Sequence, residues 1–569
     1  MCGIWALFGS PSADVFKYLD ACLRIKHRGP DAFRIEGDHH LPHSCLAFHR
    51  LCVVDDLHGM QPFRLRNFPF LYLLYNGEIY NHRLIQDEHN FVYETALDGE
   101  CILHLYNKGG MEYCAQQLDG EFAFTLIDAE KRQIYVGRDT FGVRPAFRMT
   151  IKDKGILGIC SEAKGLIDLT LKEEYVGAKI EPVPPGKIET YSIDEDGQVH
   201  LLHNKAFLKT GEVPKYRTLV TKFEDDPLKN VENLLVAAVR KRLMAHRRIG
   251  CFLSGGLDSS LIAAILVREA KAAGITYPIQ TFSIGMEDAP DVLAARKVAA
   301  HIKSEHHEVI FTTEEALESL EHVIYHLETY DITTIRASVG MFLVSKYVRE
   351  KTDTVVMYSG EGADELAQGY IYFHKAPNSK DGHEESMRLM NDLYLYDVLR
   401  TDRCTAAHGL EVRPPFLDHQ FTSYYLSLPK EDRIPKEGIE KYFLRKAFAG
   451  QNLIPEEILW RPKEAFSDGI STMKKSWFQV LQEHCATLIS DADFASREKF
   501  YPHLTPPTKE AFYYRKVFEK YYPEREQWIP YFWMPKWSPN ATDPSARTLS
   551  NYKLTTTEEG AHPVQNGKL

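Results

Sequence analysis

The chain has 569 residues, 44% of them hydrophobic, which is enough for two or more domains that each have a core. A formal net charge of -11 gives no nucleic-acid footprint, and no apolar run approaches the roughly 20 residues of a membrane helix, so we expect neither partner. The ten cysteines are scattered without a C-x-x-C pair, which argues against structural zinc and is typical of a reduced, cytosolic protein.

Residues 2–190 predict an α+β domain in which antiparallel sheets are combined with helices. Apolar residues recur with helical spacing at 15–25 and 100–108. Short apolar or alternating runs between turn residues predict strands at 70–75, 122–127 and 133–137. The next segment, 191–227, is polar and irregular, and we expect it to be a linker.

From residue 228 to 536 the sequence alternates strands with helices, which predicts an α/β domain with a parallel sheet. Its expected strands are 249–253, 279–284, 306–311 and 354–358. The part after about residue 385 is mainly helical and rich in aromatic residues. The polar tail, 540–569, is expected to be disordered.

The word Ser254–Ser260, SGGLDSS, lies between a predicted strand and a predicted helix. A glycine pair there lets backbone amides close on an anion, and the helix N-terminus adds partial positive charge. Ser254, Ser259 and Ser260 supply hydroxyl donors, while the carboxylate of Asp258 makes sense beside phosphate mainly when a cation bridges them. An ordinary capped turn is the simpler alternative.

The seven-residue word lacks the lysine of the GxxxxGK[ST] loop, so it is not that nucleotide site. It resembles the pyrophosphate-binding loop, SGGxDS, of the ATP pyrophosphatase superfamily, whose members adenylate a substrate. The resemblance implies an ATP site on an adenine nucleotide alpha hydrolase-like sheet.

A second word, Ser359–Glu365, follows a predicted strand, so it is expected at the same edge of the sheet as the first. Asp364 beside Asp258 suits magnesium through carboxylate oxygens and water. Glu361 suits a base or an orienting group near the acyl group. Spacing alone supports equally well a helix N-terminus decorated with acids.

Three further words are less informative. Asp331–Ser338 carries hydroxyls and Arg336, which suits a carboxylate or phosphate. Arg461–Gly469 offers Lys463, which suits charge developing on leaving phosphates. Without a family resemblance both are surface loops, and Leu410–Asp418 has no assignable chemistry.

Cys2 directly follows the initiator methionine. Removal of Met1 leaves a thiol and an α-amine on one residue, and an amine with a pKa near 8 is able to activate its own side chain. For Cys2 taken alone, a small buried residue that happens to be second is the simpler interpretation.

Three words change this balance: Cys2–Ile4 (CGI), His27–Asp31 (HRGPD) and Tyr75–Asn81 (YNGEIYN). Together they resemble the class II, N-terminal-nucleophile (Ntn-hydrolase) glutamine amidotransferases. Asn76 and Gly77 suit an oxyanion hole, although Asn-Gly is also the commonest hairpin turn.

Both halves together, over residues 2 to about 547, resemble the glutamine-dependent asparagine synthetase family. The resemblance implies Cys2 as nucleophile, with Arg50 on the glutamine α-carboxylate and Asp98 on its α-amine. The implied residues around glutamine are Arg50, Leu51, Val53, Val54, Asn76, Gly77, Glu78 and Asp98. Those around ATP are Phe252, Ser254, Gly255, Asp258, Ser259, Ser260, Ile284, Ser359 and Gly360. Those around the reacting groups are Thr333, Arg336, Glu361 and Lys463.

By the same resemblance, ATP adenylates the side chain of L-aspartate, and ammonia from L-glutamine travels through an internal tunnel to displace AMP. ATP as substrate, Mg²⁺ held by Asp258 and Asp364, a cytosolic location and a homodimer are implied as well. Phe252, Ala363 and Pro414 depart from the family's usual leucine, serine and valine, but none removes a group the mechanism needs.

Two alternatives stay open. One is a glutamine-dependent adenylating ligase that acts on another carboxylate, because aspartate specificity is the part least visible in these residues. The other is an inactive regulatory relative, against which the intact Cys2, Asp258, Glu361, Asp364 and Lys463 count.

Overall fold

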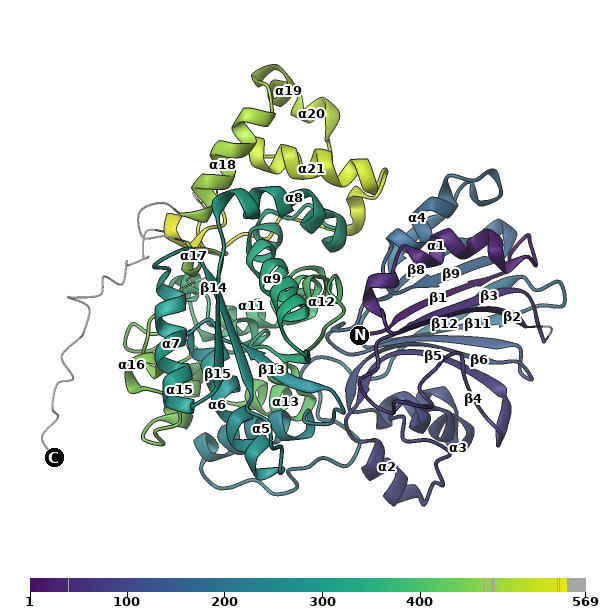
Figure 1. The fold of residues 1–569 in the computed structure, drawn as a ribbon, viewed down its shortest axis with the longest axis horizontal. Helices are drawn as coiled ribbons and strands as arrows, with labels where there is room; N and C mark the ends of the chain where they lie inside the picture. The colour runs from purple at the N-terminus through teal and green to yellow at the C-terminus, as the bar shows by residue number, and fades with distance from the viewer. Residues whose placement is uncertain (39, 465, 472–475, 540, 542, 550–569) are drawn as a thin grey trace, which may run out of the picture.

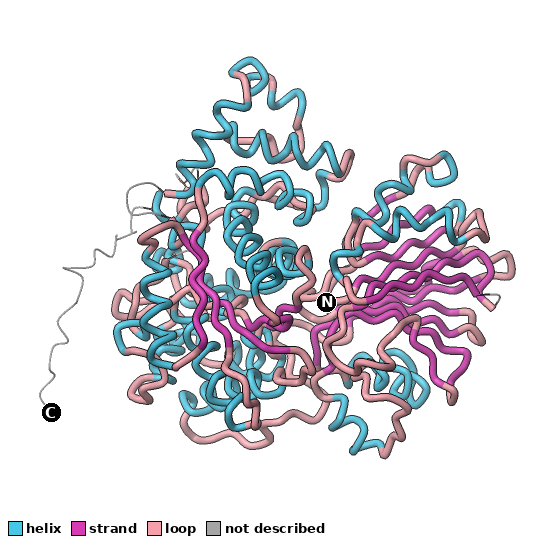
Figure 2. The backbone as a smooth tube through the Cα atoms, in the orientation of Figure 1, coloured by secondary structure: helices cyan, strands magenta, loops and turns pink. Residues whose placement is uncertain are grey.

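The computed structural model describes residues 1–38, 40–464, 466–471, 476–539, 541 and 543–549. Figure 1 shows two units side by side, with the N-terminus lying between them. Strands dominate the N-terminal half, whereas helices surround a single sheet in the C-terminal half (Figure 2). None of the described helices is long and apolar enough to cross a membrane.

Two six-stranded sheets, antiparallel throughout, form the N-terminal half. The first has the order β10-β8-β9-β1-β3-β2, from β1 (Gly3–Phe8), β2 (Ala32–Asp38), β3 (Leu41–Arg50), β8 (Phe147–Ile151), β9 (Ile156–Cys160) and β10 (Lys179–Pro182). The second has the order β12-β11-β7-β6-β5-β4, from β4 (Phe63–Leu65), β5 (Phe68–Ile79), β6 (Gly120–Asp128), β7 (Gln133–Arg138), β11 (Lys187–Ile193) and β12 (Val199–Ala206).

Alternating side chains hold the two sheets together. In β1, Ile4 belongs to the core that also contains Leu74 of the second sheet, whereas Trp5 belongs to the core on the other face. Helices cover the two outer faces: α1 (Leu19–Leu23) and α4 (Lys164–Thr170) on the first sheet, α2 (His82–His89) and α3 (Glu100–Gln117) on the second. The predicted α+β architecture is confirmed, and the three predicted strands lie within β5, β6 and β7.

The prediction of a linker over 191–227 is wrong for its first part. Residues 191–193 complete β11, and β12 pairs along β11 from Val199 opposite Ile193 to Ala206 opposite Lys187. Because β12 is an edge strand held by main-chain hydrogen bonds, its side chains stay largely exposed and its composition is polar. Residues 207–226 then run without helix or strand to α5 (Pro227–Lys241).

The C-terminal half contains the predicted parallel sheet, in the order β15-β14-β13-β16-β17. Its strands are β13 (Arg248–Phe252), β14 (Gln280–Gly285), β15 (Glu305–Ile310), β16 (Thr354–Tyr358) and β17 (Glu411–Arg413). The chain builds β13, β14 and β15 outward and then crosses back to place β16 on the other side of β13. This reversal opens a crevice at the carboxyl ends of β13 and β16, where ligands of such sheets bind.

The expected disordered tail is only partly described, because residues 540, 542 and 550–569 lie outside the described residues. The expectation is wrong for 543–549. Ala546–Thr548 forms a 3-10 turn, and both Asp543 and Leu549 are buried.

Candidate active sites

A cavity of about 200 Å³, the larger cavity, lies at the carboxyl ends of β13, β14 and β16. Seven of the nine expected ATP-binding residues line it: Phe252, Ser254, Asp258, Ser259, Ile284, Ser359 and Gly360. Gly255 and Ser260 do not, because Gly255 packs against α7 (Pro290–Ile302) and Ser260 is fully buried in α6 (Leu257–Ala272). The structure thus brings the two predicted loops to one site.

The first loop is preorganised by glycine and hydroxyl groups. Gly255 has a φ of +73°, and a Cβ there would lie 2.4 Å from the backbone nitrogen of Ala295. The backbone amide of Ser254 donates to the Ser259 hydroxyl at 3.1 Å, and that of Gly256 donates to the Ser254 hydroxyl at 3.3 Å. The N-terminus of α6 therefore opens onto the larger cavity with its loop already folded.

Two lysines pair with the aspartates that were expected to share a metal, and one of them lies between the two carboxylates. The Lys441 ammonium contacts both Asp258 and Asp364, and that of Lys463 lies 2.5 Å from Asp364 Oδ2. Burial by itself would raise the pKa of Asp364, but the two ammonium groups outweigh it and the pKa lies well below its usual range. Sequence reasoning missed Lys441.

The acidic residues fit a magnesium ion. Asp258 Oδ1 is buried and has no hydrogen-bond partner among the described residues, and Asp364 lies across the same ammonium group. Carboxylate oxygens held close together are the donors that Mg²⁺ prefers. Lys441 occupies the space between them, so an ion there displaces its ammonium group.

Glu361 lines the larger cavity and is paired with Arg400, whose Nη2 lies 2.9 Å from Oε1. Burial raises the pKa of Glu361 above its ordinary value, against the opposing charge of Arg400. Arg400 also contacts Asp397 at 3.0 Å, and Thr333 lines the same wall. Sequence reasoning missed Arg400 and Asp397, which lie on a helix without a recognisable motif.

Arg336 was expected to face a reacting carboxylate or phosphate, and its guanidinium is instead engaged elsewhere. It donates to Glu510 at 2.7 and 2.6 Å and to Asp543 at 2.8 and 2.7 Å. Arg336 still lines the larger cavity, but these two carboxylates take both edges of its guanidinium.

A second cavity of about 30 Å³, the smaller cavity, lies in the N-terminal half around Cys2. The amide of Leu51 approaches the Cys2 sulfur at 3.4 Å, and burial raises the pKa of the thiol. The expected residues that line this cavity are Cys2, Arg50, Leu51, Val53, Val54, Gly77, Glu78 and Asp98. Only Asn76 of the expected set does not line it.

Asn76 and Gly77 lie inside β5, opposite Ala123 and Phe122, so the hairpin-turn alternative is wrong. Asn76 is fully buried, and neither atom of its side-chain amide has a hydrogen-bond partner among the described residues. Gly77 has a φ of +146°, and a Cβ would lie 2.0 Å from the carbonyl oxygen of Glu121. Asn76 does not line the smaller cavity, but its neighbour Gly77 does, and an unpaired buried amide is the kind of donor that an oxyanion hole requires.

Both charged groups expected to hold glutamine line the smaller cavity. Arg50 donates to the carbonyl oxygens of Asp55 and Asp56, the latter at 3.0 Å. Asp98 accepts hydrogen bonds from the Tyr75 hydroxyl at 2.6 Å and the Ile79 amide at 2.7 Å. Burial, its largest influence, raises the pKa of Asp98 to about 6.

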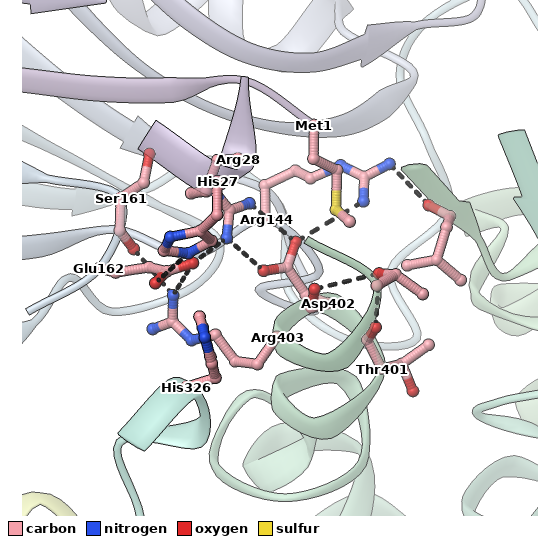
Figure 3. A network of polar contacts seen from close by, with 12 residues as sticks. Met1, His27, Arg28, Arg144, Ser161, Glu162, His326, Thr401, Asp402 and Arg403 are labelled. Atoms are coloured by element: carbon pink, nitrogen blue, oxygen red, sulfur yellow. Dashed lines mark hydrogen bonds and ion pairs between the residues drawn. The ribbon is translucent and has the colours of Figure 1, made fainter. Parts of the chain in front are cut away.

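The two halves of the chain contact each other next to Cys2. Arg28 donates to the Cys2 carbonyl oxygen at 3.0 Å. It also donates to both carboxylate oxygens of Asp402, at 2.8 and 3.1 Å (Figure 3). Glu411 of β17 lines the smaller cavity and lies 3.3 Å from the Met1 amine. The word 410–418, which had no assigned chemistry, therefore reaches the N-terminal nucleophile from the other half of the chain.

The same interface holds one candidate metal cluster, in which ligand atoms of His27, Glu162 and His326 lie within 4.8 Å of one another. The Glu162 carboxylate is already paired with Arg28 at 2.7 Å, with Arg403 at 3.2 Å and with Lys164. Three cations on the single carboxylate disfavour a further positive ion, so these residues do not fit a metal.

This pairing of a cysteine-centred cavity with a phosphate-loop cavity defines a two-domain amidotransferase, and family models agree. Residues 1–182 match the model described as glutamine amidotransferase domain, and residues 230–388 and 376–549 match the one described as asparagine synthase. The Gallus gallus protein named asparagine synthetase [glutamine-hydrolyzing] is 57% identical over 560 residues, which cover 97% of this chain and 99% of that protein. The Homo sapiens protein of the same name is 56% identical over 561 residues, with the same coverage. The chain belongs to the glutamine-hydrolysing asparagine synthetase family.

Proposed function

We propose that this protein makes L-asparagine from L-aspartate, with ATP as the energy source and glutamine as the nitrogen donor. The observation that carries the proposal is that one chain places a half-buried cysteine thiol in one cavity and the glycine-rich Ser254–Ser260 loop in another. The near full-length similarity to proteins named asparagine synthetase favours aspartate over other carboxylates.

In the smaller cavity, the Cys2 thiol attacks the side-chain amide of glutamine. The amide nitrogen leaves as ammonia after protonation, and the thioester is then hydrolysed to glutamate. The Asn76 amide and the Gly77 backbone N–H stabilise the oxyanion, since Asn76 has no other partner among the described residues. Arg50 and Asp98 orient the α-carboxylate and the α-amine.

In the larger cavity, a β-carboxylate oxygen of aspartate attacks the α-phosphorus of ATP and pyrophosphate leaves. Ammonia then attacks the acyl carbon. The bond between this carbon and the AMP oxygen breaks, so that AMP leaves, and the nitrogen loses a proton. The first loop holds phosphate, Lys463 offsets charge on the leaving group, and Glu361 orients the acyl group or accepts the proton. Asp258 and Asp364 would hold Mg²⁺, which would supply positive charge against the phosphates.

The proposal includes a cytosolic enzyme, in keeping with ten cysteines that are all free thiols, and a homodimer, which rests on the family resemblance alone. Removal of Met1 is a separate part of the proposal, because only its loss gives Cys2 the α-amine that acts as base. Intact-mass measurement of active enzyme tests it, and retained Met1 would contradict it.

Pyrophosphate release and product analysis test the proposal directly. Wild-type protein with aspartate, ATP and magnesium is expected to release pyrophosphate and to form asparagine when either glutamine or ammonium is present. The Cys2→Ala variant should lose glutamine hydrolysis and keep synthesis from ammonium, while Cys52→Ser, a neighbouring thiol outside the smaller cavity, should keep both. Formation of another amide instead of asparagine would overturn the assignment.

A further inference from the structure

The loop that follows Arg50 contains one residue with a strained backbone, Asp55. Its φ is +53°, in the left-handed region that few residues other than glycine adopt, and its side chain is only 6% exposed. Its Oδ1 accepts hydrogen bonds from the backbone amides of Leu57 at 3.1 Å and His58 at 3.0 Å. An aspartate tolerates this conformation because its short side chain bonds to the backbone that follows.

The other carboxylate oxygen of Asp55 bonds to a different segment of the chain. Oδ2 accepts a hydrogen bond from the backbone amide of Ala96 at 2.9 Å, two residues before Asp98. The carbonyl group of Asp55 meanwhile accepts a hydrogen bond from the Arg50 guanidinium. One residue therefore binds the expected carboxylate-holding arginine through its main chain and the segment of the expected amine-holding aspartate through its side chain.

The Arg50 guanidinium has little freedom within this arrangement. The carbonyl oxygen of Asp56 accepts from Nη1 at 3.0 Å, and a Cβ added at Gly59 would lie 2.7 Å from Nη2. Asp55 itself does not belong to the residues that line the smaller cavity. It does not touch substrate there, so any effect on glutamine passes through Arg50 and the Ala96–Asp98 segment.

We propose that Asp55 is a positioning residue for glutamine, which sets the separation between the Arg50 guanidinium and the Asp98 carboxylate. The inference rests on the proposed hydrolysis of glutamine at Cys2. Because glutamine carries its carboxylate and amine on a single carbon, a change in that separation weakens binding before it affects the chemistry at the amide.

Three substitutions separate the contributions of Asp55. Asp55→Gly keeps the left-handed backbone and removes the carboxylate, whereas Asp55→Ala removes the carboxylate and also strains the backbone. Asp55→Asn keeps an acceptor for the Leu57 and His58 amides but places an NH₂ group opposite the Ala96 amide. Asp288→Ala is the matched control, since Asp288 also has a left-handed backbone, with a φ of +63°, but is exposed and lines neither cavity.

The measurements are KM and kcat for glutamine hydrolysis, and the glutamine concentration that protects Cys2 from alkylation by iodoacetamide. We expect KM and the protecting concentration to rise at least about tenfold in Asp55→Ala and Asp55→Gly and less in Asp55→Asn, while kcat changes less. Synthesis from ammonium and the melting temperature report on folding, and the control should stay within about twofold of wild type.

An unchanged KM in Asp55→Gly, with synthesis from ammonium intact, would overturn the positioning role. Equal losses in kcat and in ammonium-dependent synthesis across all three variants would also overturn it, since they would mark a purely structural residue. If wild-type protein itself failed to hydrolyse glutamine, the proposed function would fail instead, and alkylation protection would still decide the binding role.

Discussion

In the larger cavity the acidic side chains already have cationic partners: Asp258 and Asp364 lie against Lys441, and Glu361 lies against Arg400. At the smaller cavity some polar atoms stay unpaired: Glu78 Oε2 in its lining, and both amide atoms of Asn76 next to the lining residue Gly77, have no hydrogen-bond partner among the described residues. The difference matches the ligands. A polyanion such as ATP would exchange one set of ion pairs for another, whereas a neutral amide needs donors that are free before it arrives.

Synthesis in the larger cavity should therefore be lost when one of its carboxylates is removed. Asp258→Asn is expected to lower synthesis from both glutamine and ammonium by at least roughly 1,000-fold, because phosphate charge is no longer neutralised. Glutamine hydrolysis in the smaller cavity should stay within about twofold of wild type. Asp353→Asn, an aspartate 71% exposed just before β16, is the control and should leave both activities intact. Retained synthesis in Asp258→Asn would show that the charge is not needed.

At the smaller cavity, the substitution that lowers activity should differ from the one that lowers stability. Asn76→Ala is expected to lower kcat for glutamine hydrolysis roughly 100- to 1,000-fold, with little loss of melting temperature, because its amide makes no hydrogen bond to lose within the described structure. Asn81 is the matched control: its amide donates to the Gln117 carbonyl at 2.8 Å and accepts from the Asp119 amide at 3.0 Å. Asn81→Ala should lower the melting temperature and spare kcat. The reverse pattern would refute the oxyanion assignment.

The Asp98 carboxylate predicts a pH dependence for the use of glutamine in the smaller cavity. Asp98 has a pKa raised to about 6, so it is ionised at neutral pH and becomes protonated as pH falls through about 6. Only the carboxylate binds the α-ammonium of glutamine, so KM for glutamine should rise towards tenfold per pH unit below that value. KM for ammonium, corrected for its own ionisation, should not follow. Asp98→Asn should have a high KM that is flat with pH, and a persisting slope would place the titration elsewhere.

Short local motifs predicted most of the expected glutamine- and ATP-binding residues that line the two cavities, and contacts distant in sequence made the rest unpredictable. Cys2 and Ser254–Ser260 were recognisable because each word carries its own chemistry. Lys441 lies 183 residues from Asp258, in the left-handed N-cap of α15 (Tyr442–Phe448), where no local pattern marks it. Arg336 suggested an open anion site because its partners Glu510 and Asp543 are 174 and 207 residues away. The sequence did not predict strand β12, because an edge strand does not need apolar side chains.

Substitution of Lys441 has the smallest expected effect, and it tests the comparison between the two cavities most directly. Its ammonium group lies between Asp258 and Asp364, the carboxylates proposed to hold Mg²⁺, so we expect lysine and metal to compete. Lys441→Met keeps the aliphatic stem and removes the charge, and the magnesium concentration that gives half-maximal synthesis should fall by about fivefold. Lys436→Met, which removes a partly exposed lysine paired with Asp432, is the control and should leave that concentration unchanged. An increased magnesium requirement in Lys441→Met would mean that the lysine supports the metal rather than competing with it, and the larger cavity would then not work by exchange of ion pairs.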